Sequence, residues 1–256
     1  MNTLSACVIT LNEERNLPRV LRSVDGIADE VVVVDCGSDD RTLDIAREHG
    51  AKVFAHPWSG YSNQKNFAAQ EAAREWILSL DADEEVSPEL RTSLLAWKRT
   101  RPEYDVYEFA RRSFYLGGWI SHSGWYPDRQ RRLFRRGAAK FSGMVHEALR
   151  FNGVVGRLKG DLLHYPINSM AEHHDKVERY STLAARQMRL EGKRNWRAGF
   201  YLAAPWSWVR SYIIQGGFLD GDRGRIIARM ACLTVRLKYR KLGQMLIKQA
   251  EENNRQ

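Results

Sequence analysis

Short apolar segments of strand length alternate with helical segments through the first part of the chain, and this alternation restricts the fold more than any other feature. Four such strand segments are present, at residues 4–10, 30–35, 52–55 and 76–81. Strands that alternate with helices pair in parallel, and their carboxyl ends then meet at one edge of a sheet. The sequence therefore predicts an α/β fold with a mostly parallel sheet flanked by helices, of which the first reaches Val24 and is capped by Asn12.

Acidic residues stand where these strands end. Asp35 closes the second strand, and Asp81 and Asp83 follow the fourth. Two carboxylates one residue apart offer hard oxygen ligands to a divalent cation, Mg²⁺ or Mn²⁺, which can bridge to nucleotide phosphates. Asp35 can accept hydrogen bonds from a nucleotide base or ribose, or it can form a local turn. The pattern predicts a metal-nucleotide site at this edge of the sheet.

The D-x-D pattern is not specific by itself. With fourteen Asp in 256 residues, about 0.8 copies are expected by chance, and Asp220-Gly221-Asp222 is a second copy. The first copy ends an apolar strand, whereas the second lies between Gly217 and Gly224 in a basic segment. Position therefore favours a functional role for the first copy and a turn for the second.

Basic residues near this edge offer partners for phosphate. Lys65 is expected in the first turn of a helix, where the helix dipole favours anions, so a bound phosphate or the nearby carboxylates would supply the negative charge. An ordinary surface lysine is the alternative. Five arginines lie between 129 and 136, and alternation along a strand would turn some toward a diphosphate or acceptor phosphate. Arg131 and Arg132 are the candidates, with no choice between them.

Four motifs together, in order and spacing, resemble those of family 2 glycosyltransferases with the GT-A fold. They are Thr10-Leu11-Asn12-Glu13-Glu14, Asp35-Cys36-Gly37-Ser38-Asp39-Asp40, Gly60-Tyr61 with Asn63-Gln64-Lys65-Asn66, and Asp81-Ala82-Asp83. The later segments resemble the bacterial subgroup that adds sugars to the lipopolysaccharide core, notably inner-core β-glucosyltransferases acting on heptose. The resemblance covers nearly the whole chain. One departure is Cys36, where the family often has Ser or Asn.

The resemblance implies a role for each matching residue. The residues expected to bind the nucleotide or donor are Thr10, Asn12, Glu13, Asp35, Gly37, Lys65, Asp81, Ala82 and Asp83. Asp35 would contact the uracil or ribose, with Lys65 in the same neighbourhood. Asp81 would lie near the donor sugar and ribose, and Asp83 would ligate the metal.

A glycosyl transfer with inversion also needs a base that takes the proton from the acceptor hydroxyl. Glu147 is the candidate, with His146 beside it, because the resembled subgroup has a His-Glu pair at this place; another acidic residue could serve instead. His164 ends a later apolar strand, and its imidazole could join Asp83 on the metal. A buried, hydrogen-bonded histidine is the alternative.

A glycine-rich aromatic segment at 117–128 is suited to a lid or a platform for sugar. Packing between aromatic residues is the alternative.

The C-terminal part differs in charge from the rest. Residues 192–256 contain thirteen basic and four acidic residues, which accounts for the whole net charge of +9. The segment 198–219 is aromatic and apolar, but Pro205, Arg210 and Gly216-Gly217 interrupt it, so it does not predict an uninterrupted membrane-spanning helix. Trp and Tyr beside basic residues favour the boundary between membrane and water, with a solvated basic face as the alternative.

These features predict two domains, a GT-A catalytic domain at 1–168 and a helical, basic extension at 169–256. The expected activity is metal-dependent transfer of a sugar, glucose being favoured, from a UDP-sugar to a lipid-linked lipopolysaccharide core acceptor. Polyprenyl phosphate or another envelope glycan is an alternative acceptor. A different class of function is also an alternative, namely a lipid- or nucleic-acid-binding module without catalysis. The converging carboxylates disfavour such a module because they repel polyanions.

The expected location is the cytoplasm, peripheral on the inner membrane and in contact with its anionic surface. The three cysteines lack metal-ligand spacing, which favours a reducing compartment. No basic segment followed by an apolar core stands at the N-terminus.

Overall fold

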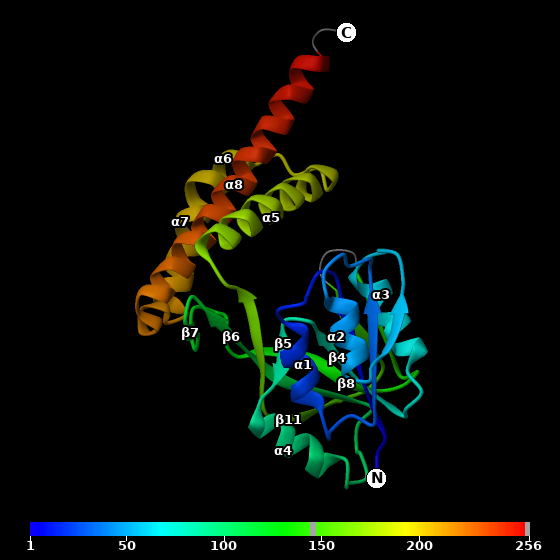
Figure 1. Ribbon diagram of the computed structural model, residues 1–256. Coiled ribbons are helices and arrows are strands. Elements are labelled where there is room, and N and C mark those ends of the chain that lie inside the picture. The colour runs from blue at the N-terminus through cyan, green and yellow to red at the C-terminus, as the bar shows by residue number, and fades with distance from the viewer. Residues whose placement is uncertain (144–146, 254–256) are drawn as a thin grey trace. The chain divides into compact units, whose positions relative to one another are not determined.

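The computed structural model describes residues 1–143 and 147–253, and the chain forms two compact units (Figure 1). Unit 1 comprises Met1–Arg112 and Asp128–His164. Unit 2 comprises Ser113–Pro127 and Tyr165–Gln256. The helices expected after residue 168 thus lie in unit 2 together with the segment 113–127.

The four predicted strands form the parallel part of a mixed sheet in unit 1. They are arranged in the order β3-β2-β1-β4, with bounds β1 Leu4–Thr10, β2 Glu30–Asp35, β3 Lys52–Ala55 and β4 Trp76–Asp81. Thr10 on the central strand β1 is paired with Asp35 on one side, and Ile9 with Asp81 on the other. This register brings the polar strand ends to one edge, as the sequence predicts.

Strands of the later chain extend the sheet. β8 (Asp128–Arg135) pairs antiparallel with β4 and with β6 (Val106–Tyr115). Beyond β6 the order continues with β11 (Val155–Ile167) and β5 (Glu84–Val86). Three further short strands complete the described set: β7 (Gly118–Trp119), which pairs with β6, and the hairpin of β9 (Ala139–Ser142) and β10 (Ala148–Phe151). The predicted α/β fold is confirmed.

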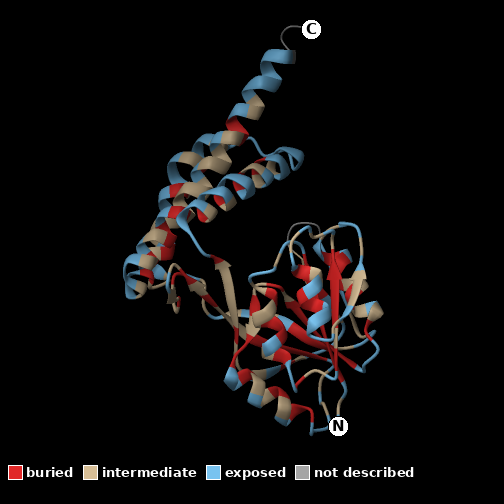
Figure 2. Ribbon diagram, in the orientation of Figure 1, coloured by how far each residue is buried: buried red, intermediate tan, exposed pale blue. Residues whose placement is uncertain are grey.

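Helices cover both faces of this sheet, so its central strand β1 is buried throughout (Figure 2). Side chains alternate along a strand: Leu4, Ala6 and Val8 pack toward one apolar core, and Cys7 and Ile9 toward the other. The first core includes residues of α1 (Leu17–Val24), α2 (Thr42–Glu48) and α4 (Pro88–Trp97), and the second includes residues of α3 (Tyr61–Glu71).

The helix after β1 begins later than predicted. Asn12 does not cap it, because α1 starts at Leu17 with Asn16 in the N-cap position. Asn12 has a φ of 56°, and its side-chain oxygen accepts a hydrogen bond from the Asp39 amide at 3.0 Å. Asn is one of the few residues that tolerate left-handed backbone. It therefore joins the loop after β1 to the loop after β2.

Unit 2 consists mainly of helices. α5 (Met170–Leu190) is capped by Ser169, whose hydroxyl accepts a hydrogen bond from the Glu172 amide at 3.1 Å, and α8 runs over Gly221–Asn253. The segment between them is largely helical: α6 (Trp196–Ala198), a π-helical turn η1 (Gly199–Ala203), α7 (Ala204–Val209), a second π-helical turn η2 (Arg210–Ile214) and a 3₁₀ turn η3 (Gly217–Asp220). Over the described residues, no helix combines the length and hydropathy needed to cross a bilayer.

The second D-x-D copy has a structural role in unit 2. The carboxylate of Asp220 accepts hydrogen bonds from the backbone amides of Ser121 and His122 and from the hydroxyl of Ser123, each at 3.0 Å. It thereby fastens the glycine-rich segment near 120 to the start of α8. Aromatic rings of that segment pack within unit 2, with Trp125 against Tyr115 and Trp119 against Tyr165.

Candidate active site

Asp35 organises the loop that follows β2. Its carboxylate accepts hydrogen bonds from the backbone amides of Gly37 and Ser38 at 2.8 Å, from the Thr10 hydroxyl at 3.0 Å and from the Ser38 hydroxyl. A carboxylate can accept about four hydrogen bonds, and these four contacts fill that capacity. This is the arrangement expected if Asp35 forms a local turn. Gly37 has a φ of 106°, and no atom lies within 4 Å of the place its Cβ would take. The loop therefore offers open space at Gly37, held in place by Asp35.

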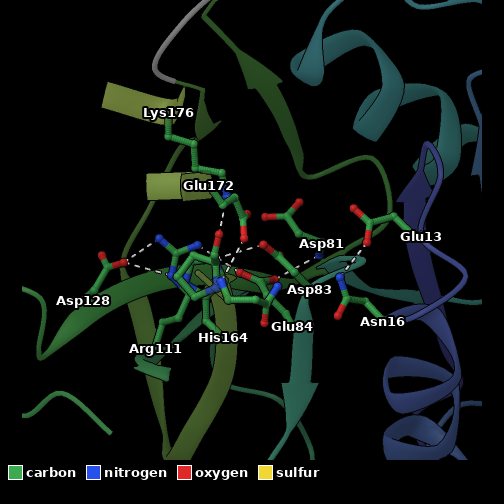
Figure 3. A network of polar contacts seen from close by, with 12 residues as sticks. Glu13, Asn16, Asp81, Asp83, Glu84, Arg111, Asp128, His164, Glu172 and Lys176 are labelled. Atoms are coloured by element: carbon green, nitrogen blue, oxygen red, sulfur yellow. Dashed lines mark hydrogen bonds and ion pairs between the residues drawn. The ribbon is translucent and has the colours of Figure 1, made fainter. Parts of the chain in front are cut away.

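The loop after β1 is bound to the same region. The Asn12 amide donates to the Ser38 hydroxyl and the Glu13 amide to the Thr42 hydroxyl, both at 2.8 Å. The Glu13 carboxylate accepts from the Asn16 side chain at 2.8 Å (Figure 3). The residues assigned to the nucleotide by resemblance thus fold together around two strand ends.

Lys65, Asp81, Arg132 and Glu147 form the centre of a chain of alternating charges. Lys65 Nζ lies 2.7 Å from Asp81 Oδ1 and also pairs with Glu147 Oε1, while Arg132 pairs with Asp81 Oδ2. The side chains of Lys65 and Arg132 are only 1% and 4% exposed. We expected either a bound phosphate or nearby carboxylates to supply the negative charge beside Lys65. The fold itself supplies the carboxylates.

The protonation of this centre is fixed by its partners. Burial favours the neutral form of Asp81, but the charges of Arg132 and Lys65 outweigh it and hold the pKa of Asp81 well below its usual range. Burial likewise opposes the charge of Arg132, yet Asp81 and Glu84 raise its pKa. Asp81 is therefore an anion and Arg132 a cation at any physiological pH.

Glu84 continues the chain of charges and was not among the predicted site residues. It is fully buried, with Oε1 at 2.7 Å from Arg132 Nη2 and 3.1 Å from Arg111 Nη1, and Oε2 accepts from the Asp81 amide at 3.0 Å. Arg111 in turn pairs with Asp128 at 2.6 Å (Figure 3). A signal for Glu84 existed in the sequence: arginines on neighbouring strands can be buried only beside acidic partners.

Asp83 and His164 meet at the same end of the sheet. His164 Nε2 lies 3.4 Å from Asp83 Oδ2, and both side chains remain partly exposed (Figure 3). Among the described residues, no three His, Cys, Asp or Glu side chains gather as a complete metal site. One or two protein ligands, completed by substrate phosphates and water, are usual for Mg²⁺. The pair is therefore suited to a cation that arrives with a diphosphate.

A cavity of about 540 Å³ opens beside the chain of charges. Arg131 and Arg132 both line it but differ in burial. Arg132 is buried between carboxylates, whereas Arg131 is exposed with its guanidinium over Phe151. Arg131 is thus the better placed of the two for an incoming anion. The other residues around the cavity are Asp81, Glu108, Arg111, Arg129, Gln130, Phe141, Glu147, Ala148 and Leu149.

The two carboxylate oxygens of Glu147 differ in their partners among the described residues. Its Oε1 is held by Lys65, while Oε2 is buried and has no hydrogen-bond partner in the described part of the chain. An anchored carboxylate with one oxygen left for a substrate hydroxyl is suited to general base chemistry. His146, predicted beside it, lies outside the described residues.

Comparison with known proteins bears on these features. A family model described as glycosyl transferase family 2 matches residues 5–156. An uncharacterized glycosyltransferase of Rickettsia typhi is 30% identical over 262 residues, covering 97% of this chain and 89% of its own length. The lipopolysaccharide core biosynthesis glycosyltransferase LpsC of Rhizobium meliloti is 32% identical over 240 residues, covering 88% of each chain. A crystal structure of S. aureus TarS, residues 1–349, is 17% identical with a TM-score of 0.49, covering 93% of this chain and 91% of that one.

The resemblance noted in the sequence is confirmed, and with it the GT-A-like fold, a curled mixed sheet between helices. The family match takes in the parallel strands and all of the charged residues from Lys65 to Glu147. This chain therefore belongs to glycosyl transferase family 2 and is a glycosyltransferase.

Proposed function

We propose that this glycosyltransferase moves a sugar, with glucose favoured, from a UDP-sugar to a heptose hydroxyl of a lipid-linked lipopolysaccharide core acceptor at the cytoplasmic face of the inner membrane. The observation that carries the chemistry is the pairing of Lys65 with Asp81 and Glu147, two carboxylates that line one cavity. The acceptor class is supported by the similarity to LpsC, whose name assigns it to lipopolysaccharide core biosynthesis.

The donor would occupy the edge formed by the ends of β1, β2 and β4. The loop at Gly37 leaves open space there, and the Asp35 contacts fix its backbone. Asp83 and His164 would hold a divalent cation, which when bound neutralises the charge of the departing diphosphate. Asp81 stays ionised beside them because Lys65 and Arg132 flank it.

The acceptor would approach from the cavity. Its hydroxyl oxygen forms the new bond to the anomeric carbon on the side opposite the leaving nucleotide, which inverts that centre. The bond from the anomeric carbon to the diphosphate breaks, and the UDP leaves with that electron pair. The proton of the hydroxyl passes to Glu147 Oε2, whose partner oxygen is fixed by Lys65.

The test of this proposal is transfer and donor binding with a panel of nucleotide-sugars. We expect a UDP-sugar to bind most tightly in calorimetry, more tightly with Mn²⁺ or Mg²⁺ than with EDTA. Asp83→Ala should lower the rate of sugar transfer, measured as UDP formed, by about 10²- to 10³-fold, because charge stabilisation at the leaving group is lost.

The second D-x-D copy supplies a matched control. Asp222 is an exposed residue paired with Arg225, so Asp222→Ala should leave turnover unchanged. Preferential binding of a guanine or cytidine nucleotide would remove the UDP assignment. Equal activity of the Asp83→Ala and Asp222→Ala variants would remove the metal assignment.

A further inference from the structure

The helical segment from Gly199 to Leu219 in unit 2 exposes large apolar side chains. Seven of them are more than half exposed, with Leu202 at 70%. We call these seven the outer face: Tyr201, Leu202, Trp206, Ile213, Ile214, Phe218 and Leu219. Exposed apolar side chains scattered singly are normal, but a gathering of this kind marks a surface that meets another apolar phase.

Tyr201, Leu202, Trp206, Ile213 and Ile214 of the outer face lie on the helix that leads from α6 to η2, and Phe218 and Leu219 lie on the turn η3 that follows it. Leu202, Trp206, Arg210 and Ile213 follow each other at spacings of three or four residues, which places them above one another on a helix. Arg210 is the one charged residue of the sequence between 199 and 219. The side turned to solvent is thus apolar along most of its length.

The opposite side of this helix carries small residues that pack against α8. Gly199 and Ala204 are buried on this side, and Ser211 is buried where its hydroxyl donates to the Ser123 carbonyl at 3.2 Å. A Cβ on Gly199 would lie 2.1 Å from the Tyr239 ring of α8, so this ring occupies the space that a side chain at position 199 would need. Farther along, a Cβ on Gly224 would lie 1.8 Å from the carbonyl oxygen of Gly217.

This arrangement reverses the usual amphipathic helix. A helix on a water-exposed surface turns its large apolar residues inward, whereas here the buried residues are small and many of the large apolar residues are exposed. Helices that pack through Gly, Ala and Ser with Leu and Ile outside are typical of an apolar surrounding. Because the described helices are not suited to span a bilayer, that surrounding is the interfacial region of a membrane.

The charge of residues 192–256 distinguishes between the partners that could cover such a face. Residues 192–256 carry the full +9 of the chain, and part of this charge is a row of exposed arginines on α8: Arg225, Arg229, Arg236 and Arg240. Two copies meeting through the outer face would bring two such basic segments together, which repulsion disfavours. A bilayer with anionic headgroups offers apolar depth for Trp206 and Leu202 and counter-charge for the arginines.

We propose that the outer face is a membrane-binding surface that inserts between the headgroups of a bilayer containing anionic lipid. The proposed function gives its setting, a membrane that carries the acceptor, and in that respect the inference rests on it. The surface itself is argued from unit 2 alone, and its test measures lipid binding rather than sugar transfer.

The experiment is flotation of the full chain with vesicles of phosphatidylcholine alone and of phosphatidylcholine with phosphatidylglycerol. We expect binding to the anionic vesicles, weakened by added salt. The double substitution Leu202→Gln/Ile213→Gln should lower the partition coefficient by at least about tenfold, because each buried aliphatic side chain contributes to insertion. Tryptophan quenching by brominated lipid should be reduced in Trp206→Phe.

Matched controls lie on α5 of the same unit. Leu183 and Leu190 are also exposed, at 40% and 82%, so Leu183→Gln/Leu190→Gln makes the same chemical change away from the outer face and should bind vesicles like the unmodified chain. Equal losses in the two double variants would overturn the proposal. So would a lipid-free dimer in sedimentation velocity that Leu202→Gln/Ile213→Gln dissociates while vesicle binding is unchanged.

Failure of this inference can be told from failure of the proposed function. Leu202→Gln/Ile213→Gln should retain the turnover of the unmodified chain on a water-soluble heptoside acceptor. Asp83→Ala should float with anionic vesicles as the unmodified chain does. Vesicle binding that disappears in Asp83→Ala would contradict a surface located in unit 2.

Discussion

The two units depart from the usual distribution of residues in opposite directions. Unit 1 buries charges, with Lys65, Arg132 and Glu84 almost entirely out of solvent, whereas unit 2 exposes apolar side chains such as Leu202 and Trp206. Neither is common in a soluble fold, because buried charges and large exposed apolar surfaces are both costly. Each departure therefore points to something the fold meets: a charged ligand in one unit and an apolar phase in the other.

The comparison also shows that apolar content does not decide where a helix turns its side chains. α1 of unit 1 buries Leu17, Val20, Leu21 and Val24 and meets water with its polar side. The helix from Gly199 to Ile214 has comparable apolar residues but buries the small ones. What differs is the inner partner: α1 meets a sheet that accepts large side chains, while the later helix meets α8 where the Tyr239 ring fills the space beside Gly199.

The largest effect should come from the charged region. Glu147→Gln should lower kcat by about 10²- to 10⁴-fold, the usual contribution of a general base, while the UDP-sugar dissociation constant stays within a factor of two. Single-turnover transfer and calorimetry measure the two quantities. Glu108 lines the same cavity, so Glu108→Gln is the control; an equal or greater loss in that variant would move the base to Glu108.

The buried charges should also support the fold. Arg132→Met leaves the carboxylates of Asp81 and Glu84 without their shared cation, and loss of one partner of a buried ion pair costs about 3–5 kcal/mol in unfolding free energy. Chemical denaturation gives this value. Glu84→Gln on the Arg132→Met background should recover part of it. A loss below about 1 kcal/mol would show that Lys65 and Arg111 compensate.

Acid should act on unit 1 through Glu30. Burial favours its neutral form, but hydrogen bonds from Lys52, Ser5 and the Ala73 amide lower its pKa from 4.5 to about 2. Because the folded pKa is the lower one, the stabilisation is complete above pH 4.5 and is lost as the pH falls toward 2, about 3 kcal/mol in all. Thermal unfolding across this range should therefore depend less on pH in Glu30→Gln. Parallel curves for the two proteins would contradict this.

The smallest effect should come from the contact between helices in unit 2. Gly199→Ala places a methyl group against Tyr239, and overpacking of this kind costs about 1–3 kcal/mol. Chemical denaturation of the single variants and of Gly199→Ala/Tyr239→Ala forms a double-mutant cycle. On the Tyr239→Ala background the alanine should cost little. An undiminished cost there would place the strain elsewhere.

Much of the fold could be predicted from local sequence. β1, β2 and β3 were predicted with the bounds they have, because short apolar runs between turn residues admit few other interpretations. The start of α1 was predicted wrongly. Asn12 and Asn16 are equally good caps by residue type, and only the bond from the Asp39 amide, formed across two loops, decides between them.

The site was predictable where it depends on strand ends and not where it depends on strand order. Asp35 and Asp81 were found from the ends of β2 and β4, and Asp83 and His164, proposed as partners, do lie together. Their roles in catalysis stay predictions. Glu84 and Asp128 were missed. Their pairing with Arg111 requires that β8 insert between β4 and β6, although β8 follows both of these strands in the sequence.

The Asp220 contacts have a consequence for biosynthesis. Asp220 is translated 98 residues after His122, roughly 5–20 s later at the usual rate of about 5–20 residues per second. The amides that it will bind must wait on the ribosome for that time, whereas every residue of unit 1 has been made once His164 is added. Unit 1 can thus be complete while unit 2 is still being synthesised, and a nascent chain released ahead of Asp220 would lack the residue that binds the amides of Ser121 and His122.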